Sequence, residues 1–166
     1  MPTCLIVMGV AGAGKTTLAL ALAERLGWGF LDADRLHPQA NVAKMRAGLP
    51  LDDADRAPWL TAVAEWIDAQ DGASVVACSA LKRAYRTRLV EGRPQARVVY
   101  LDASPELIAA RVTQRADHYF PASLIASQFE ALEPPAPDEH AIVVDIADPT
   151  ETQVAAVIAH IPAYQA

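Results

Sequence analysis

Eight residues near the start of the chain, GVAGAGKT at positions 9–16, have the composition and spacing of a phosphate-binding loop. Gly9 and Gly14 bracket four small residues and precede Lys15 and Thr16, which fits the pattern G-x-x-x-x-G-K-[ST]. Small residues allow consecutive backbone N–H groups to turn inward around an anion. Lys15 can then reach the β- and γ-phosphates of ATP, and the Thr16 hydroxyl can ligate Mg²⁺. The residues that we expect to contact the nucleotide here are Gly9, Val10, Ala11, Gly12, Ala13, Gly14, Lys15, Thr16 and Thr17.

Two carboxylates, Asp32 and Asp34, come at the end of a short apolar stretch that starts at Phe30. In extended backbone, residues two apart point to the same side. Phosphoryl transfer uses one carboxylate near Mg²⁺ and another that orients or deprotonates the acceptor hydroxyl. We expect Asp32 to act in the water shell of Mg²⁺ and Asp34 to act on the acceptor. The alternative is an ordinary pair of turn or N-cap aspartates.

The elements that must position these groups alternate between strands and helices, which predicts a parallel sheet covered by helices on both faces. A helix over Thr17–Leu26 is predicted from leucines spaced four apart, and Gly27 ends it. Further helices are predicted to open at Pro58 and to span 82–91. Two more are predicted to begin within Ser104-Pro105-Glu106 and Asp148-Pro149-Thr150-Glu151, where Ser104 and Asp148 are the expected N-caps. The predicted strands are Cys4–Met8, Phe30–Asp32, Ser74–Cys78, Arg97–Leu101 and Ala141–Val144.

Length and composition indicate one globular domain over residues 1–166, with 52% hydrophobic and 20% charged residues. The net charge of −6 argues against a nucleic-acid partner. No apolar run has the length of a membrane span and no leader precedes the first strand, so we expect a cytoplasmic protein without a membrane partner. Cys4 and Cys78 lie in apolar runs and are expected to pack in the core. All 14 basic residues fall between Lys15 and Arg115, where phosphates and an anionic acceptor would bind.

Several longer blocks are more specific than the phosphate loop, which would not distinguish among kinases. They are D-A-D-R-L-H-P at 32–38, N-V-A-K-M at 41–45, G-L-P-L-D-D-A-D-R at 48–56, P-W-L at 58–60, C-S-A-L-K-R at 78–83, Y-R at 85–86, S-Q-F-E at 127–130 and L-E at 132–133. These blocks resemble the gluconokinase family, and the resemblance runs from the first strand to the last helix.

The resemblance implies a P-loop kinase with three α/β/α layers, a five-stranded parallel sheet in the order 2-3-1-4-5 and a mobile lid over about residues 111–121. It implies transfer of the ATP γ-phosphate to the 6-hydroxyl of D-gluconate, an acceptor-binding insertion over about 36–56, and a homodimer. Arg111 and Arg115, one helical turn apart, match lid arginines that neutralise the transferring phosphoryl group. Arg115 is thus expected to be catalytic with Lys15 and Asp34. The segment Asp145–Pro149 matches the region that contacts adenine, and Pro149 is the residue expected to do so.

Gluconate carries a carboxylate and a row of hydroxyls, so its pocket should combine cations with hydrogen-bonding groups. Structural alternatives stay open for several candidates: His37 could be fixed by Pro38, Arg56 could cap an acidic turn, and Lys82 with Arg86 could form a solvated helix face. Which cation binds the carboxylate is left open. The substrate-binding candidates are Asp34, His37, Lys44, Arg56, Ser79, Lys82 and Arg86.

Two positions depart from the family pattern. Asp117 stands where the family usually has glycine, beside the expected lid arginines. Ala33 also replaces a frequent glycine, a change that is tolerated if the backbone φ there is negative. Two other functions remain as alternatives: a kinase of the same fold for a shikimate-like or other polyol acid, and a switch module that hydrolyses ATP slowly without an acceptor. The predicted acceptor pocket argues against the switch.

Overall fold

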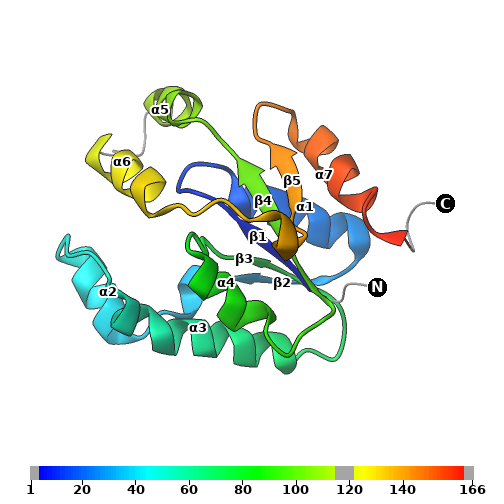
Figure 1. Cartoon of the computed structure of the whole chain (residues 1–166), viewed down its shortest axis with the longest axis horizontal. Helices are drawn as coiled ribbons and strands as arrows, with labels where there is room; N and C mark the ends of the chain where they lie inside the picture. Colours follow the sequence, from blue (N-terminus) through cyan, green and yellow to red (C-terminus); the bar gives the residue numbers. More distant parts are fainter. Residues whose placement is uncertain (1–3, 115–121, 163–166) are drawn as a thin grey trace.

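The computed structural model describes residues 4–114 and 122–162, and a parallel five-stranded sheet lies at its centre (Figure 1). The strand order is β2-β3-β1-β4-β5, which confirms the predicted order. Every strand boundary falls within one residue of the prediction. The strands are β1 (Cys4–Met8), β2 (Gly29–Asp32), β3 (Ser74–Ala77), β4 (Ala96–Asp102) and β5 (Ile142–Asp145).

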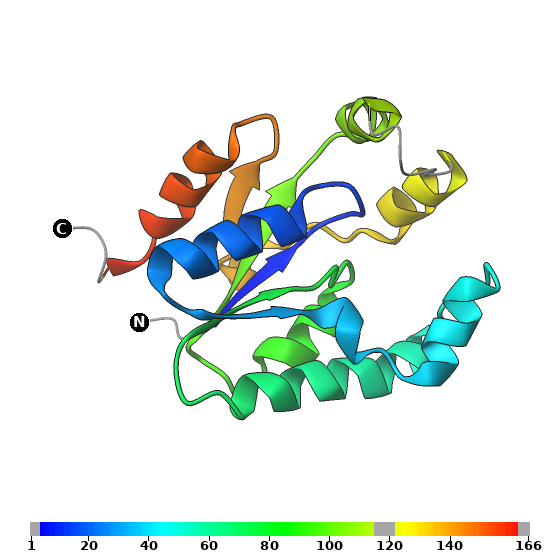
Figure 2. The ribbon, with the colours of Figure 1, turned by 180° about the vertical axis from the view of Figure 1, so that it is seen from behind.

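Helices cover both faces of the sheet. Figure 1 shows α3 and α4 below the strands, and Figure 2 shows α1 crossing the opposite face. The helices are α1 (Lys15–Leu26), α2 (Gln39–Arg46), α3 (Asp53–Asp68), α4 (Arg83–Val90), α5 (Pro105–Gln114), α6 (Ala122–Ala131) and α7 (Thr150–Ile158), with short 3₁₀ helices η1 (Ala33–Leu36) and η2 (Pro137–Glu139).

The central strand β1 is buried on both faces, as expected for a parallel sheet between helical layers. Leu5 and Val7 join the apolar cluster beneath α1 and α7, whereas Ile6 and Met8 join the cluster with α3 and α4. This rigid strand carries the phosphate loop at its carboxyl end, where ligands bind in open α/β sheets.

Predicted helix starts differ from the structure at α1, α3 and α7. Helix α1 begins at Lys15 rather than Thr17. Helix α3 begins at Asp53 rather than Pro58, because Asp52 and Asp55 form a reciprocal capping box: Asp55 N–H donates to Asp52 Oδ1 at 2.7 Å and Asp52 N–H to Asp55 Oδ2 at 3.0 Å. Pro58 is tolerated inside the helix at the loss of one backbone bond. Helix α7 is capped by Pro149 without a side-chain bond, so Asp148 is not its N-cap.

The segment 36–55, for which no periodic element was predicted, contains α2 and the first turn of α3. No helix in the described ranges is long and apolar enough to cross a membrane. The expectation for the cysteines is confirmed: Cys4 and Cys78 are free and buried. Burial raises the pKa of the Cys4 thiol to about 11 and that of Cys78 to about 12, so both stay neutral at physiological pH.

Candidate functional site: a phosphate loop beside a cationic acceptor cluster

The phosphate loop joins β1 to α1, and its glycines have the conformations that the motif requires. Gly14 has φ +91° and nothing within 4 Å of the position of a Cβ, so it turns the chain into α1 and leaves the approach open. Gly12 has φ +84° and lies against α5, where a Cβ would meet Val112 and Ile108 at 3.4 and 3.5 Å. The free N–H groups at the start of α1 therefore point, with the positive end of the helix dipole, toward the space beside the loop.

Lys15 lies within this loop rather than extending into solvent. Its Nζ donates to the backbone carbonyl of Val10 at 3.0 Å. Burial lowers the pKa of Lys15, and the negative charges of Asp34 and Asp32 partly oppose that shift. The lysine is thus a partly desolvated cation close to both predicted carboxylates, and a phosphate oxygen can replace or join its carbonyl partner.

Asp32 and Asp34 were predicted to point to the same side of a continuous strand, and the structure shows that they do not. Asp32 ends β2, and the chain turns at once into η1, because Asp32 Oδ1 accepts the N–H of Asp34 at 3.0 Å. The carboxylate of Asp34 is 77% exposed and lies 3.9 Å from Nε2 of His37. Asp34 therefore stands at the surface between Lys15 and the residues of the predicted acceptor pocket. The preceding Ala33 has no positive φ, so its substitution for glycine is accommodated.

The residues present fit the expected Mg²⁺. The Thr16 hydroxyl is on an exposed residue at the start of α1, and Asp32 is half-buried at the end of β2. Mg²⁺ binds through one or two protein oxygens, together with water and substrate phosphates. Within residues 4–114 and 122–162 there is no group of three or more His, Cys, Asp or Glu that could hold a metal, and a site built on nucleotide phosphates needs none.

A pocket of about 340 Å³ opens next to the phosphate loop, at the end of β5. Arg111 lines it and donates to the carbonyl of Ile146. Two residues predicted to contact the nucleotide, Arg111 and Pro149, thus lie together with loop residues beside one cavity, which suits the nucleoside part of ATP. Its lining consists of Ala13, Gly14, Thr17, Arg111, Asp148, Pro149, Thr150 and Gln153.

His37 is fixed by two neighbours on the other side of Asp34. Its ring stacks on Trp59 with centroids 4.2 Å apart and planes 15° from parallel. Its Nδ1 lies 3.2 Å from Nδ2 of the buried Asn41, which also donates to the carbonyl of Asp55 at 2.9 Å. Burial lowers the pKa of His37, with Asp34 opposing and Arg56 reinforcing the shift. His37 is therefore a positioned, neutral hydrogen-bonding group at pH 7, and Pro38 is not what holds it.

Lys44 reaches the same cluster from α2. Its Nζ lies 2.8 Å from Oδ2 of Asp55, and this hydrogen bond raises the pKa of Lys44 and lowers that of Asp55. Asp55 also holds the capping box of α3. Lys44 thus fastens α2 to α3 while its side chain stays 40% exposed.

Arg56 and Lys82 flank one aromatic ring. The guanidinium of Arg56 lies 5.5 Å, and the ammonium of Lys82 5.7 Å, from the ring centroid of Tyr85. Arg56 also donates to Leu51 O at 2.7 Å and Tyr85 OH at 3.2 Å. Tyr85 OH donates to Asp53, and Lys82 lies 3.5 Å from the same carboxylate. Two cations are thereby held close together, with one carboxylate between them, where an anionic acceptor group could bind.

Ser79 and Arg86 follow β3 but differ in accessibility. Ser79 is half-buried, and its carbonyl accepts the N–H of Gly9 at 3.3 Å, which ties it to the phosphate loop. Arg86 is 1% exposed; it forms a two-bond ion pair with Glu139, at 2.7 and 3.1 Å, and donates to the carbonyls of Ala80 and Leu81, both at 3.0 Å. This geometry speaks against direct substrate contact by Arg86, and equally against a solvated helix face. It supports Ala80, whose φ of +44° is strained for a non-glycine residue.

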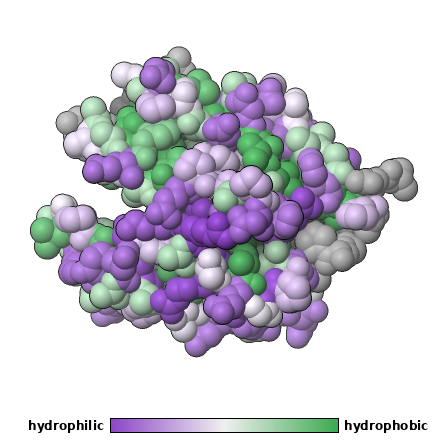
Figure 3. Space-filling view, viewed as in Figure 1, coloured by the Kyte–Doolittle hydropathy of each residue, from purple (hydrophilic) through white to green (hydrophobic). Residues whose placement is uncertain are grey.

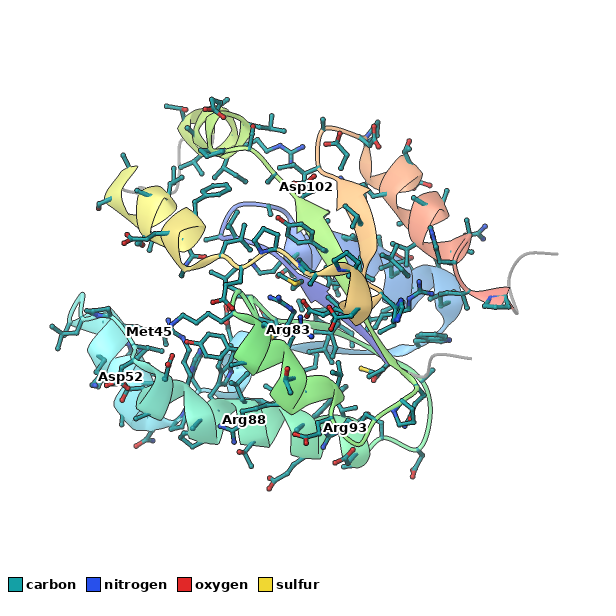
Figure 4. The ribbon with its side chains drawn as sticks, viewed as in Figure 1. Met45, Asp52, Arg83, Arg88, Arg93 and Asp102 are labelled. Atoms are coloured by element: carbon teal, nitrogen blue, oxygen red, sulfur yellow. The ribbon has the colours of Figure 1, made fainter. Side chains whose placement is uncertain are left out.

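The elements that carry these residues surround one end of the molecule. In Figure 3 the surface is hollowed at the left, between the parts that carry α6 and α2, and hydrophilic side chains border the hollow. Figure 4 places Met45 of α2 and Asp52 at the start of α3 on the lower side of this opening. Arg88, on α4, and Arg93, after the end of α4, lie farther from it. Arg115 and Asp117 fall outside the described residues.

A phosphate loop between a buried parallel strand and a helix, with a nucleoside-sized pocket on one side and a cationic cluster on the other, defines a P-loop kinase. A family model described as "AAA domain" matches residues 5–135. The chain is 49% identical to a gluconokinase of Gluconobacter oxydans over 86% of this chain and 82% of that protein. It is 41% identical to the thermoresistant gluconokinase of Escherichia coli over 92% and 90%. The chain belongs to the gluconokinase family.

Solved structures agree. A gluconokinase from Sinorhizobium meliloti superimposes with a TM-score of 0.89 at 40% identity, covering 98% of this chain and 93% of that one. Shikimate kinase from Bacteroides thetaiotaomicron matches with a TM-score of 0.69 at 19% identity, over 96% and 98% of the two chains. That second likeness supports the fold alone, so the shikimate-like alternative is not favoured.

Sequence reasoning assigned no role to four residues of the site. Asn41, Asp53, Trp59 and Tyr85 all lie within the quoted family blocks, yet their roles are to hold other side chains. The buried Asn41 was the hardest of these to find from sequence, because a polar residue on an otherwise solvated helix follows no periodic pattern that marks it as buried.

Proposed function

We propose that this protein transfers the γ-phosphoryl group of ATP to the 6-hydroxyl of D-gluconate and produces 6-phospho-D-gluconate and ADP. The observation that carries the proposal is the position of Asp34, which lies close enough to Lys15 to influence its pKa and 3.9 Å from His37. It thus joins the phosphate loop to the acceptor cluster. The membership of the gluconokinase family supports gluconate as the acceptor.

In the proposed reaction, Asp34 orients the 6-hydroxyl and takes its proton as the hydroxyl oxygen bonds to the γ-phosphorus. The bond from that phosphorus to the β–γ bridging oxygen breaks, and ADP leaves with the electron pair. Lys15 and the loop N–H groups stabilise the negative charge on the phosphoryl oxygens. Thr16 and Asp32 would hold Mg²⁺, directly and through water, and the ion supplies further positive charge at the β- and γ-phosphates.

The acceptor is proposed to bind between η1, α3 and α4. Arg56 and Lys82 offer the pair of cations for its carboxylate, and Asp53 sets how strongly they attract it. His37, Lys44 and Ser79 are proposed to bind hydroxyls. Arg86 is left out of direct contact because its guanidinium is buried against Glu139.

Arg111 is proposed to contact the nucleotide, since it lies in the pocket beside Pro149 and the loop. Arg115 remains our proposal for the group that neutralises the transferring phosphoryl group, and residues 111–121 for the lid. We further propose that the protein works as a homodimer in the cytoplasm, where ATP is available and free thiols such as Cys4 and Cys78 persist.

The chemical test is the identity of the product. After incubation with MgATP and D-gluconate, the ³¹P NMR signal of the product should be a triplet, coupled to the two protons of C6. A doublet would place the phosphate on a secondary hydroxyl and overturn the proposed orientation. Inorganic phosphate released at the same rate with and without gluconate would instead favour the switch module.

A further inference from the structure

One hydrogen bond joins the phosphate loop to a helix more than a hundred residues away. The N–H of Ala11 donates to Oε1 of Gln128, on α6, at 3.0 Å. Because Ala11 N–H is a donor, the carbonyl end of the Gln128 side chain must face the loop. Ala11 is one of the loop residues expected to contact the nucleotide, whereas Gln128 belongs to neither the pocket beside the loop nor the acceptor cluster described above.

Helix α6 packs against α5 and against the main apolar cluster. None of its residues is fully buried, and Ala131 at its end packs against the main apolar cluster, as do the half-buried Ile125 and Phe129. Gln128 lies between these two in sequence, so the apolar contacts on either side orient its side chain toward the loop. A directed polar contact of this kind, beside a small apolar anchor, fixes the position of a helix more sharply than apolar packing alone.

The neighbouring loop residue is held from the other side. A Cβ on Gly12 would meet Val112 and Ile108 of α5 at 3.4 and 3.5 Å, so the backbone of the loop packs directly on that helix. Consecutive loop residues, Ala11 and Gly12, are therefore held by α6 and α5 respectively. Their placement decides where the inward-turning N–H groups of the loop point.

We propose that Gln128 is a positioning residue for the phosphate loop, which acts through the Ala11 N–H to hold the loop in the shape that binds the nucleotide triphosphate. It does not contact the acceptor. The proposal depends on the use of ATP and not on the identity of the acceptor as gluconate. Binding of ATP measured without an acceptor therefore keeps its outcome separate from that of the proposed function.

The first test is Gln128→Met, which keeps the length of the side chain and removes the acceptor oxygen. We expect the Kd for MgATP to rise, and kcat/KM for ATP to fall, about tenfold, as for loss of one hydrogen bond to a preorganised group. The KM for gluconate should stay within about twofold. The matched control is Glu130→Gln, an exposed residue on the same helix, which should leave all three values unchanged.

The second test removes the other partner of the bond. Ala11→lactic acid, introduced by nonsense suppression, replaces the backbone N–H by an ester oxygen and keeps the methyl side chain. In a double-mutant cycle, the effects of the two changes on the Kd for MgATP should not multiply, because each change deletes the same contact. Three results would overturn the proposal: ATP binding unchanged in Gln128→Met, tighter ATP binding in it, or effects of the two changes that multiply. Tighter binding would mean that Gln128 competes with phosphate for Ala11.

Discussion

The ring of His37 lies flat against Trp59, 4.2 Å between centroids, and the indole Nε1 of the same Trp59 donates to the carbonyl of Ala33 at 2.7 Å. One buried side chain of α3 thereby holds both ends of the short helix η1, which carries Asp34. The placement of the proposed catalytic carboxylate thus depends on a residue that contacts no substrate.

Trp59→Phe should remove the bond to Ala33 and weaken the stack with His37. We expect a loss of about 1–3 kcal/mol in the free energy of unfolding, from the unpaired buried carbonyl and the smaller ring. The KM for gluconate should rise more than the KM for ATP. Trp66→Phe, on the same helix but only half-buried, is the control and should leave the ratio of the two KM values unchanged. Equal effects of both variants on that ratio would contradict the role of Trp59.

The stability of the protein should fall on mild acidification through His37. Its folded-state pKa is lowered by burial, so the unfolded chain binds the proton more readily. The contribution of His37 is therefore full above its unfolded pKa of about 6.5 and is lost as pH falls below that value. Chemical denaturation at a series of pH values from about 5.5 to 7.5 measures this slope. His37→Gln should flatten it; an unchanged slope in the variant would assign the effect to other groups.

Lys15→Met should separate catalysis from stability. Because Lys15 is a desolvated cation whose partner is a carbonyl, removing its charge should cost little or no stability. The loss of charge stabilisation at the phosphoryl group should lower kcat by about 10²–10³-fold. Thermal unfolding and steady-state kinetics of the same sample measure both. A large drop in Tm together with nearly normal kcat would mean that Lys15 has a structural role and not a catalytic one.

Glu139 offers the test of Arg86, because it changes the partner and leaves the guanidinium in place. Glu139→Ala leaves a buried arginine unpaired and should lower the free energy of unfolding by about 3–5 kcal/mol. Arg86 lowers the pKa of Glu139 through their hydrogen bonds, so this stability is present at neutral pH and lost as pH falls through that lowered pKa. Asp138→Ala breaks the exposed pair with Arg83 and should change the free energy of unfolding little, because solvent screens an exposed ion pair. If Glu139→Ala lowers the free energy of unfolding no more than Asp138→Ala does, the buried pair of Arg86 and Glu139 does not stabilise the fold.

Arg115 and Arg111 are expected to differ in kinetics. Arg115→Ala should lower kcat by roughly 10³-fold with little change in ATP affinity, because its contribution arises in the transition state. Arg111→Ala, in the nucleoside pocket, should mainly raise the KM for ATP. Unchanged kcat with a raised KM in Arg115→Ala would reject the transition-state role.

The sequence predicted the fold well because its signals are local. Buried parallel strands such as β1 are short apolar runs, and the phosphate loop is one contiguous motif. The start of α3 was missed because Pro58 was given more weight than the capping box formed by Asp52 and Asp55. The site was predicted only in part, because several of its contacts join residues that are far apart in sequence.

Contacts between residues far apart in sequence leave no local pattern. Arg86 looked like a substrate cation because Glu139, 53 residues away, could not be seen to be its partner. Gln128 was visible only as part of a family block, since its bond to Ala11 spans 117 residues. The geometry of Asp34 also depended on a turn that extended-strand periodicity does not predict.

In the proposed reaction, the acceptor cluster recognises gluconate and Asp34 activates its 6-hydroxyl for direct transfer of the phosphoryl group from ATP. The most direct measurement is ADP production with MgATP in the presence of D-gluconate, shikimate, glucose, glycerate or no acceptor, for the unaltered protein and for Asp34→Asn. We predict strong stimulation by gluconate alone, and its loss in Asp34→Asn with ATP binding retained. Production of ADP that is independent of gluconate, or stimulated by another acceptor, would contradict the account.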